Sequence, residues 1–202
     1  MTQAHTQTPA RKLIVLMGMT IDGRSADGWI PAIDDQDLSA ELHRDVWKQL
    51  EDVDTFVFGR VSYEIWERAW PPLATDPSVS PFVREFSVFV QQIRKVVVSR
   101  TLKSVSWKNS MLLTGKIPDY VEKMKNEPGR NIAIVGGHGI AQHFTKLGLV
   151  DEHILWIHPV IKGSGAPQFP DINNEQPLRL LDLTVFKSGI HKVRYQTVQS
   201  TR

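Results

Sequence analysis

The amino-acid sequence contains no cysteine in its 202 residues. Disulfide-stabilised scaffolds, zinc sites with thiolate ligands and enzymes with a thiol nucleophile are therefore excluded. The same absence excludes the cysteine-liganded zinc of nucleobase deaminases. Hydrophobic residues make up 41% of the chain and charged residues 23%. This composition and this length are typical of a globular protein of one domain.

The sequence also lacks a strong net charge and a long apolar run. Lys and Arg number 24 against 22 Asp and Glu, so the formal net charge of +2 gives no sign of a nucleic-acid binder. The apolar run from Leu13 to Met19 is much shorter than the ~20 residues of a membrane span. Residues 1–10 lack the charged and apolar regions of a signal peptide and are expected to form a disordered tail. We therefore expect a cytoplasmic protein that binds neither nucleic acid nor membranes.

The histidines are not spaced as metal ligands. His138 and His143 are five residues apart, as are His153 and His158, which places neither pair on one face of a helix or strand. We interpret His138 as a cap or loop donor and the others as surface or satisfied histidines. No metal site is predicted.

Short apolar runs alternate with amphipathic segments along the chain. Strands are predicted over residues 13–17, 55–58, 95–99, 110–114, 131–135 and 153–160. Helices are predicted over residues 38–50, 61–68, 82–93, 118–126 and 140–147. Pro71-Pro72 is expected to end the second helix. Two final strands, about 178–187 and 190–198, are joined by a hairpin turn at residues 187–189.

This alternation predicts an α/β fold in which a mainly parallel sheet is covered by helices on both faces. The closing hairpin adds antiparallel strands, so the sheet is mixed. No repeat, linker or low-complexity stretch divides the chain. Residues 11–202 are therefore expected to form a single domain.

Three of the predicted strands end in groups that suit phosphate. Gly59-Arg60-Val61-Ser62 and Gly136-Gly137-His138-Gly139 each open a helix, and Ser99-Arg100-Thr101 follows a third strand. Glycines let the backbone approach a pyrophosphate, and a helix N-terminus offers free N–H donors. The guanidinium groups of Arg60 and Arg100 match phosphate oxygens. Two such helix starts and a separate Ser-Arg predict a dinucleotide that carries a third phosphate, so NADP(H) is favoured over NAD.

Other nucleotide and hydrolase motifs are incomplete. The segment from Gly137 to Gln142 lacks the third Gly or Ala of the Rossmann fingerprint. Residues 18–25 resemble a Walker A loop, but Arg24 replaces its lysine. No Gly-x-Ser-x-Gly elbow of an esterase is present.

An ordered series of segments over residues 11–198 resembles the dihydrofolate-reductase-like family, in particular the reductase domain of riboflavin biosynthesis. Residues 19–23 are similar to the family's S-L-D-G loop, and residues 58–64 to its G-R-x-T-Y-E segment, with Ser62 in place of Thr. Residues 97–102 match V-V-S-R-T-L. Residues 134–165 contain the closing G-G, G-L-V-D-E and P-V-x-x-G-x-G segments. The resemblance implies a three-layer α/β/α fold, NADPH as hydride donor and a homodimer.

Carried over to this chain, the resemblance also implies which residues hold the cofactor. Gly59, Arg60, Val61 and Ser62 would bind the pyrophosphate and the nearby ribose. Ser99, Arg100 and Thr101 would bind the adenosine 2′-phosphate. Gly136, Gly137, His138, Gly139 and Ile140 would cover the pyrophosphate from the other side. Met17, Gly18, Met19 and Asp22 would line the nicotinamide end.

The substrate segments depart from the family pattern. Val135 stands where the riboflavin-pathway reductases usually have a Glu, and their W-I-[ST] segment is reduced to Trp29-Ile30-Pro31. Asp45 is the nearest candidate for the acidic residue that binds the pterin in dihydrofolate reductases, with a solvated surface role as the alternative. Trp29 and Trp66 are candidates to stack on a flat heterocycle.

The resemblance implies an NADPH-dependent oxidoreductase that transfers hydride to a C=N or C=O carbon of a pyrimidine- or pterin-like substrate. The model for this reaction is 5-amino-6-(5-phosphoribosylamino)uracil reductase of riboflavin biosynthesis. Two alternatives stay open, a dihydrofolate or dihydropterin reductase and a non-catalytic dimeric NADP(H)-binding protein. No catalytic acid is identified, so the proton is expected to come from a bound water.

Overall fold

The computed structural model describes residues 10–25, 36–169, 172 and 175–198. Eight strands form one sheet: β1 (Leu13–Thr20), β2 (Val53–Gly59), β3 (Arg94–Val98), β4 (Ser110–Leu113), β5 (Asn131–Ile134), β6 (Glu152–His158), β7 (Leu178–Val185) and β8 (His191–Thr197). The helices are α1 (Gln36–Leu50), α2 (Arg60–Leu73), α3 (Pro81–Gln92), α4 (Ile117–Asn126) and α5 (His138–Lys146). Residues 1–9 of the predicted tail and Trp29 lie outside the described residues.

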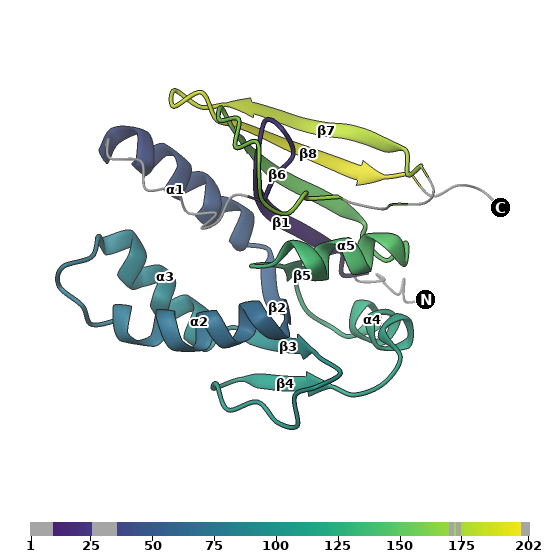
Figure 1. Cartoon of the computed structure of the whole chain (residues 1–202). Helices are drawn as coiled ribbons and strands as arrows, with labels where there is room; N and C mark the ends of the chain where they lie inside the picture. The colour runs from purple at the N-terminus through teal and green to yellow at the C-terminus, as the bar shows by residue number, and fades with distance from the viewer. Residues whose placement is uncertain (1–9, 26–35, 170–171, 173–174, 199–202) are drawn as a thin grey trace, which may run out of the picture.

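The sheet is mixed and mainly parallel. Its strand order is β4-β3-β2-β5-β1-β6-β8-β7, so β4 and β7 lie at its two edges (Figure 1). The strands from β4 to β6 in this order pair in parallel, and β8 runs antiparallel to both β6 and β7. The predicted fold class and the C-terminal hairpin are therefore confirmed.

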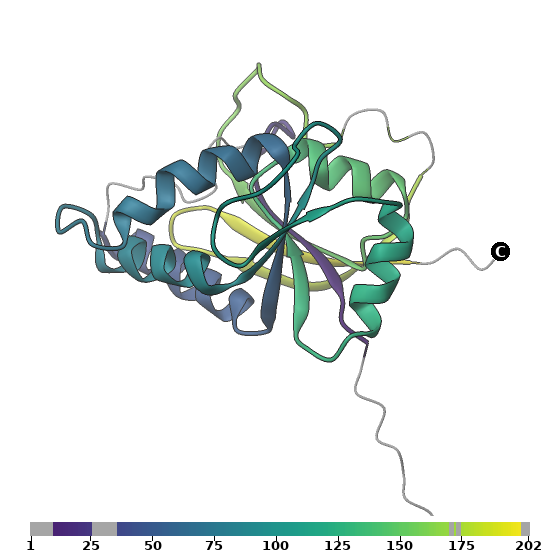
Figure 2. The same ribbon diagram turned by 90° about the horizontal axis from the view of Figure 1, so that it is seen from below.

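Helices cover both faces of the sheet. One apolar core contains buried side chains of α1, α2 and α3, and a second core contains those of α4 and α5. Figure 2 shows these two groups of helices on opposite sides of the strands. Alternate residues of β1 enter the two cores, Ile14 and Leu16 on the α1 side and Leu13 and Val15 on the α5 side. A strand buried on both faces accounts for the continuous apolar run in the sequence.

The predicted end of the second helix is wrong. Helix α2 continues to Leu73, with Pro71 and Pro72 inside its last turn. A proline removes a backbone N–H and normally interrupts the helical hydrogen bonds. Here the amide of Ala74 donates to the carbonyl of Pro71, at 3.4 Å, and the hydroxyl of Ser87 on α3 donates to the carbonyl of Trp70, at 2.5 Å. The first bond is made by the C-cap residue of the helix itself, and the second comes from the neighbouring helix α3.

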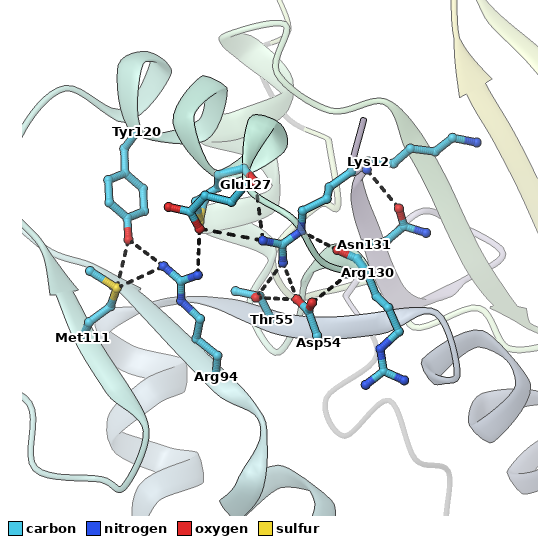
Figure 3. A network of polar contacts seen from close by, with 11 residues as sticks. Lys12, Asp54, Thr55, Arg94, Met111, Tyr120, Glu127, Arg130 and Asn131 are labelled. Atoms are coloured by element: carbon cyan, nitrogen blue, oxygen red, sulfur yellow. Dashed lines mark hydrogen bonds and ion pairs between the residues drawn. The ribbon is translucent and has the colours of Figure 1, made fainter. Parts of the chain in front are cut away.

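A buried ionic cluster joins the amino ends of four strands (Figure 3). The guanidinium of Arg11, just before β1, donates to the carboxylate of Asp54 and to the hydroxyl of Thr55 on β2. It also donates to the carbonyl of Arg130, which precedes β5. Beside it, Arg94 of β3 binds Glu127 at 2.9 Å. The cluster fixes the edge of the sheet opposite the predicted phosphate-binding loops.

A second buried cation closes the end of α3. The ammonium of Lys95 donates to the carbonyls of Gln91, Ile93 and Lys108, at 2.9–3.2 Å, and lies 4.5 Å from the ring centre of Trp107. Burial lowers the pKa of Lys95 to about 8. These contacts connect α3 and β3 to the loop that leads into β4.

None of the helices in the described ranges has the length and apolar character needed to cross a membrane.

Replacing Lys95 by methionine should lower the free energy of unfolding by about 3 kcal/mol, because three carbonyls lose their buried donor. Lys103→Met removes the same charge from an exposed position of the neighbouring loop. This control should change stability by less than about 0.5 kcal/mol. Urea denaturation of the two variants measures the difference. Equal stabilities would mean that the three contacts contribute nothing.

Candidate functional site

The parallel strands β1, β2, β3, β5 and β6 end at one edge of the sheet. The loops after β1, β2, β3 and β5 are those that the sequence predicts to bind the cofactor. Gly59 ends β2, Ser99 follows β3 and Gly136 lies just after β5. Thr20 ends β1 and His158 ends β6. Ligands of open α/β sheets bind outside the carboxyl ends of the strands. The fold thus brings the predicted loops to one edge.

The two glycine-containing helix starts lie in contact. A Cβ atom added at Gly137 would lie 2.5 Å from Oγ of Ser62, and one added at Gly59 would lie 3.4 Å from Cβ of Ile140. Gly136 has a φ of +85°, and a Cβ there would lie 3.1 Å from Cβ of Ser62. Only glycine lets the start of α5 approach the start of α2 this closely.

Both helix starts lack a side-chain cap. The N-cap residues are Gly59 for α2 and Gly137 for α5, and neither start has a side-chain capping bond. By contrast, the hydroxyl of Ser80 accepts from the amide of Val83 at the start of α3. The first N–H groups of a helix have no partner within the helix, and the dipole there favours an anion. The uncapped starts of α2 and α5 therefore suit a pyrophosphate.

Arg60 has a partner within its own helix. Its guanidinium binds Glu64 at 2.9 Å on the exposed surface of α2. An exposed pair of this kind contributes little to stability, so an incoming phosphate can replace it at low cost. Val61 is exposed beside it, with 57% of its surface accessible.

A pocket of about 580 Å³ lies beside Ser99 and Arg100. Oγ of Ser99 accepts the amides of Thr101 and Leu102, at 3.1 and 3.0 Å, and so fixes this turn. Among the described residues, Arg100 has no ion-pair partner. The pocket wall also contains Lys116 and His143, two basic residues that sequence reasoning missed. The full lining is Val98, Ser99, Arg100, Leu113, Thr114, Gly115, Lys116, Ile117, Pro118, His143 and Leu147.

The loop after β1 is tied to the loop after β6 through Asp22. The carboxylate of Asp22 accepts the hydroxyl of Thr20 at 2.6 Å and the amides of Lys162 and Gly163, at 3.1 and 2.9 Å. These hydrogen bonds, the one from Thr20 first, lower the pKa of Asp22 to about 2. The group is therefore ionised at neutral pH, and in this arrangement it positions a loop and has no proton to give.

The other predicted residues of the nicotinamide end follow the alternation of β1. Met17 is buried in the core that α4 and α5 cover, and Met19 packs against the same core. Gly18 belongs to the opposite face of the strand, between Leu16 and Thr20, and adds no side chain there. The end of β1 thus presents backbone and one small residue on the face that α1 covers.

Two predicted substrate residues have structural neighbours that account for them. Asp45 accepts from the indole N–H of Trp156 at 3.1 Å and pairs with Lys192 at 2.8 Å, so its carboxylate joins α1 to β6 and β8. Trp66 is buried among Phe58 and Trp70, while its Nε1 would lie 3.3 Å from a Cβ at Gly136. Trp66 therefore supports the glycine loop, and its role toward a substrate stays a prediction.

The contact between the two helix starts predicts different effects of an alanine at Gly137 and at Gly136. Gly137→Ala should lower the free energy of unfolding by about 1–2 kcal/mol, because the new methyl group meets Oγ of Ser62. In a Ser62→Ala background that hydroxyl is absent, and most of the loss should be recovered. Gly136→Ala should cost about 2–3 kcal/mol in both backgrounds, because its positive φ and its contact with Cβ of Ser62 persist.

A double-mutant cycle measured by urea denaturation tests the pair. A coupling of about 1 kcal/mol is expected between Gly137→Ala and Ser62→Ala, and none between Gly136→Ala and Ser62→Ala. Strict additivity at Gly137 would contradict the close approach.

Comparisons with known proteins agree with this fold. The model of the RibD C-terminal domain matches residues 11–192. The uncharacterized protein YyaP of Bacillus subtilis is 33% identical over 146 residues, which are 72% of this chain and 75% of that protein.

Two solved structures share the fold. A putative riboflavin biosynthesis protein from Shewanella sp. PV-4 has a TM-score of 0.66 at 20% identity, covering 93% of this chain and 99% of that one. The other is a diaminohydroxyphosphoribosylaminopyrimidine deaminase/5-amino-6-(5-phosphoribosylamino)uracil reductase from Thermotoga maritima. It has a TM-score of 0.60 at 14% identity, covering 94% of this chain and 57% of that one.

Proposed function

Because this chain belongs to the RibD C-terminal domain family, a family of riboflavin-pathway reductases, we propose that it is an NADPH-dependent reductase of a pyrimidine- or pterin-like substrate. The observation that carries the proposal is the pair of uncapped helix starts that lie in contact at the carboxyl edge of the sheet. Arg100 and its pocket lie at the same edge, after the neighbouring strand β3. A 5-amino-6-(5-phosphoribosylamino)uracil reductase activity is the form of the proposal closest to the family.

The residues present fit a dinucleotide with a 2′-phosphate. The N–H groups that open α2 and α5 would hold the pyrophosphate between them. Arg100, with Ser99 and Thr101, would hold the 2′-phosphate. Two basic residues, Lys116 and His143, lie on the wall of the same pocket. The adenine would lie against the apolar part of the same pocket, formed by Leu113, Ile117 and Leu147.

When bound, NADPH supplies the hydride. This chain's own contribution is to hold the reacting atoms in contact, which is the larger part of catalysis in such a site. Asp22 is ionised and bonded on both oxygens, so it does not deliver the proton. We therefore propose that a bound water protonates the substrate atom next to the carbon that receives the hydride.

One observation favours the alternative of a non-catalytic NADP(H)-binding protein. Val135 is fully buried in the core, where the riboflavin-pathway reductases usually have a Glu that faces the pyrimidine. NADPH oxidation measured with reduced-pyrimidine precursors, dihydropterins and small carbonyl compounds separates the two functions. Turnover of one heterocycle class supports the reductase. Tight NADPH binding without turnover of any of them supports the binding protein.

Arg100→Ala should weaken NADPH binding by about 10- to 100-fold and leave NADH binding unchanged, because it removes charge-assisted contacts to the 2′-phosphate only. Lys123→Ala, at an exposed position of α4 that does not line this pocket, removes the same charge and should change neither affinity. Fluorescence titration with both nucleotides measures the ratio. An unchanged preference for NADPH in Arg100→Ala would overturn the 2′-phosphate assignment.

We also propose that β7 forms the contact between two copies of the chain. Its side chains Leu178, Leu180, Leu183 and Val185 share one face of the strand and are 42–61% exposed. Strand β7 is also an edge of the sheet, with no neighbour on its outer side among the described residues. An exposed apolar edge strand is a template for association, and a second copy would cover it.

Leu183→Glu should convert the dimer to a monomer, because it places a charge in the centre of this apolar face. Arg179→Ala changes the opposite face of the same strand and should leave the dimer intact. Sedimentation equilibrium of the variants at several concentrations measures the association. A dimer that persists in Leu183→Glu would show that another surface is used.

A further inference from the structure

His158 carries a buried ring nitrogen without a hydrogen-bond partner at the carboxyl edge of the sheet. It is the last residue of β6 and lies opposite Thr20 in the parallel pairing of β6 with β1. The alternation of β6 places it on the face of Ile154 and Trp156, which α1 covers. Its Nε2 is buried, and no donor or acceptor of the described residues reaches it. The sequence interpretation of His158 as a surface or satisfied histidine is therefore wrong, because its Nε2 is buried without a partner among the described residues.

A buried polar atom without a partner costs free energy, about 1–3 kcal/mol, and a ligand that supplies the partner recovers that cost. Burial also lowers the pKa of His158, so the ring is neutral at pH 7. In a neutral imidazole, Nε2 either donates or accepts according to the tautomer. A pyrimidine or pterin edge, on which N–H groups and carbonyls alternate, offers a partner for both.

The neighbouring polar groups already have partners. The hydroxyl of Thr20 donates to Asp22 and accepts the amide of Arg24 at 3.0 Å. Deeper on the same face, Asp45 pairs with Lys192, and its other oxygen accepts from Trp156. Of these side chains, only His158 keeps an unused polar atom.

The order of the strands relates this nitrogen to the proposed cofactor site. Arg100 follows β3, the uncapped helix starts follow β2 and β5, and β1 and then β6 come next. At about 4.8 Å between neighbouring strands, β1 lies ~14 Å from β3, and β6 lies one strand further. A dinucleotide with its 2′-phosphate at Arg100 and its pyrophosphate at β2 and β5 thus ends near β1. The molecule that receives the hydride then meets the end of β6.

We propose that His158 contacts the substrate, through a hydrogen bond between Nε2 and a ring N–H or carbonyl of a pyrimidine- or pterin-like heterocycle. The inference rests on the proposed function, because it places the substrate beside the nicotinamide. The bond would determine which edge of the heterocycle is held against β6, and so which carbon faces the hydride donor.

The test uses the full chain labelled with ¹⁵N-histidine and saturated with NADP⁺, which supplies no hydride and leaves the added heterocycle unchanged. The probes are 5,6-diaminouracil and 6-methyl-7,8-dihydropterin. The ring-nitrogen resonance of His158 is assigned by its absence in His158→Gln. One of the two probes should shift this resonance.

Binding of that probe should be about 10-fold weaker in His158→Leu, as expected for the loss of one hydrogen bond to a buried group. NADP⁺ affinity should stay unchanged in this variant, and its thermal midpoint should be no lower than that of the wild type, because the unpartnered polar atom is removed. The matched control is His191→Leu, at an exposed position on the opposite face of the neighbouring strand β8, which should bind the probe as wild type does.

The outcomes distinguish the two proposals. Wild-type protein that fails to bind NADP⁺ overturns the proposed function, and the role of His158 with it. Protein that binds NADP⁺ while neither probe shifts the His158 resonance overturns the role of His158 alone. Equal probe affinity in His158→Leu and wild type does the same. A selective shift together with a selective loss of probe affinity supports the contact.

Discussion

The buried guanidinium of Arg11 is the contact on which the arrangement of the sheet depends most. It joins the start of β1 to Asp54 and Thr55 at the start of β2, and to the backbone that precedes β5. Burying a cation costs several kcal/mol unless it is fully paired, so alternative registers of these strands are disfavoured. Gly129 lets the chain close over this pair, since a Cβ there would lie 2.6 Å from Oδ2 of Asp54. Because the paired strands are parallel, alignment at this edge also sets where their carboxyl ends meet.

The order of elements and the position of the phosphate loops follow from local signals. The apolar run over residues 131–135 and the glycines after it are contiguous in the sequence, so they predict a strand and the uncapped helix start behind it. The end of α2 has no such signal. The helix continues through Pro71 and Pro72 with the help of Ser87, which lies on the next helix. The two prolines alone predict the wrong end for α2, because that prediction takes no account of a hydrogen-bond donor outside the helix.

At the site, too, sequence reasoning could not predict which residues distant in the chain come together. Asp45 has the helical position of a surface or substrate carboxylate, but its partner Lys192 is 147 residues away. Lys116 and His143 come to the pocket of Arg100 only because β4, α4 and α5 fold around it. Local sequence signals predict a surface or satisfied role for His158, because metal-ligand spacing is the only local test that applies to a lone histidine. Its unpartnered nitrogen becomes visible only when every neighbouring side chain is placed.

On the proposed function, the two ends of the candidate site would recognise their ligands in different ways, so cofactor and substrate could change independently. At the proposed cofactor end, most of the contacts would come from backbone N–H groups and from glycines that must stay small, so they would depend on the fold more than on side-chain identity. At the other end, recognition would depend on single side chains such as His158, and one replacement there would alter which heterocycle is held. Val135, buried and apolar where the riboflavin-pathway reductases usually have a Glu, is a replacement of this kind. On the proposed function, the sheet edge would therefore determine the cofactor, and the few side chains beside β1 and β6 would determine the substrate.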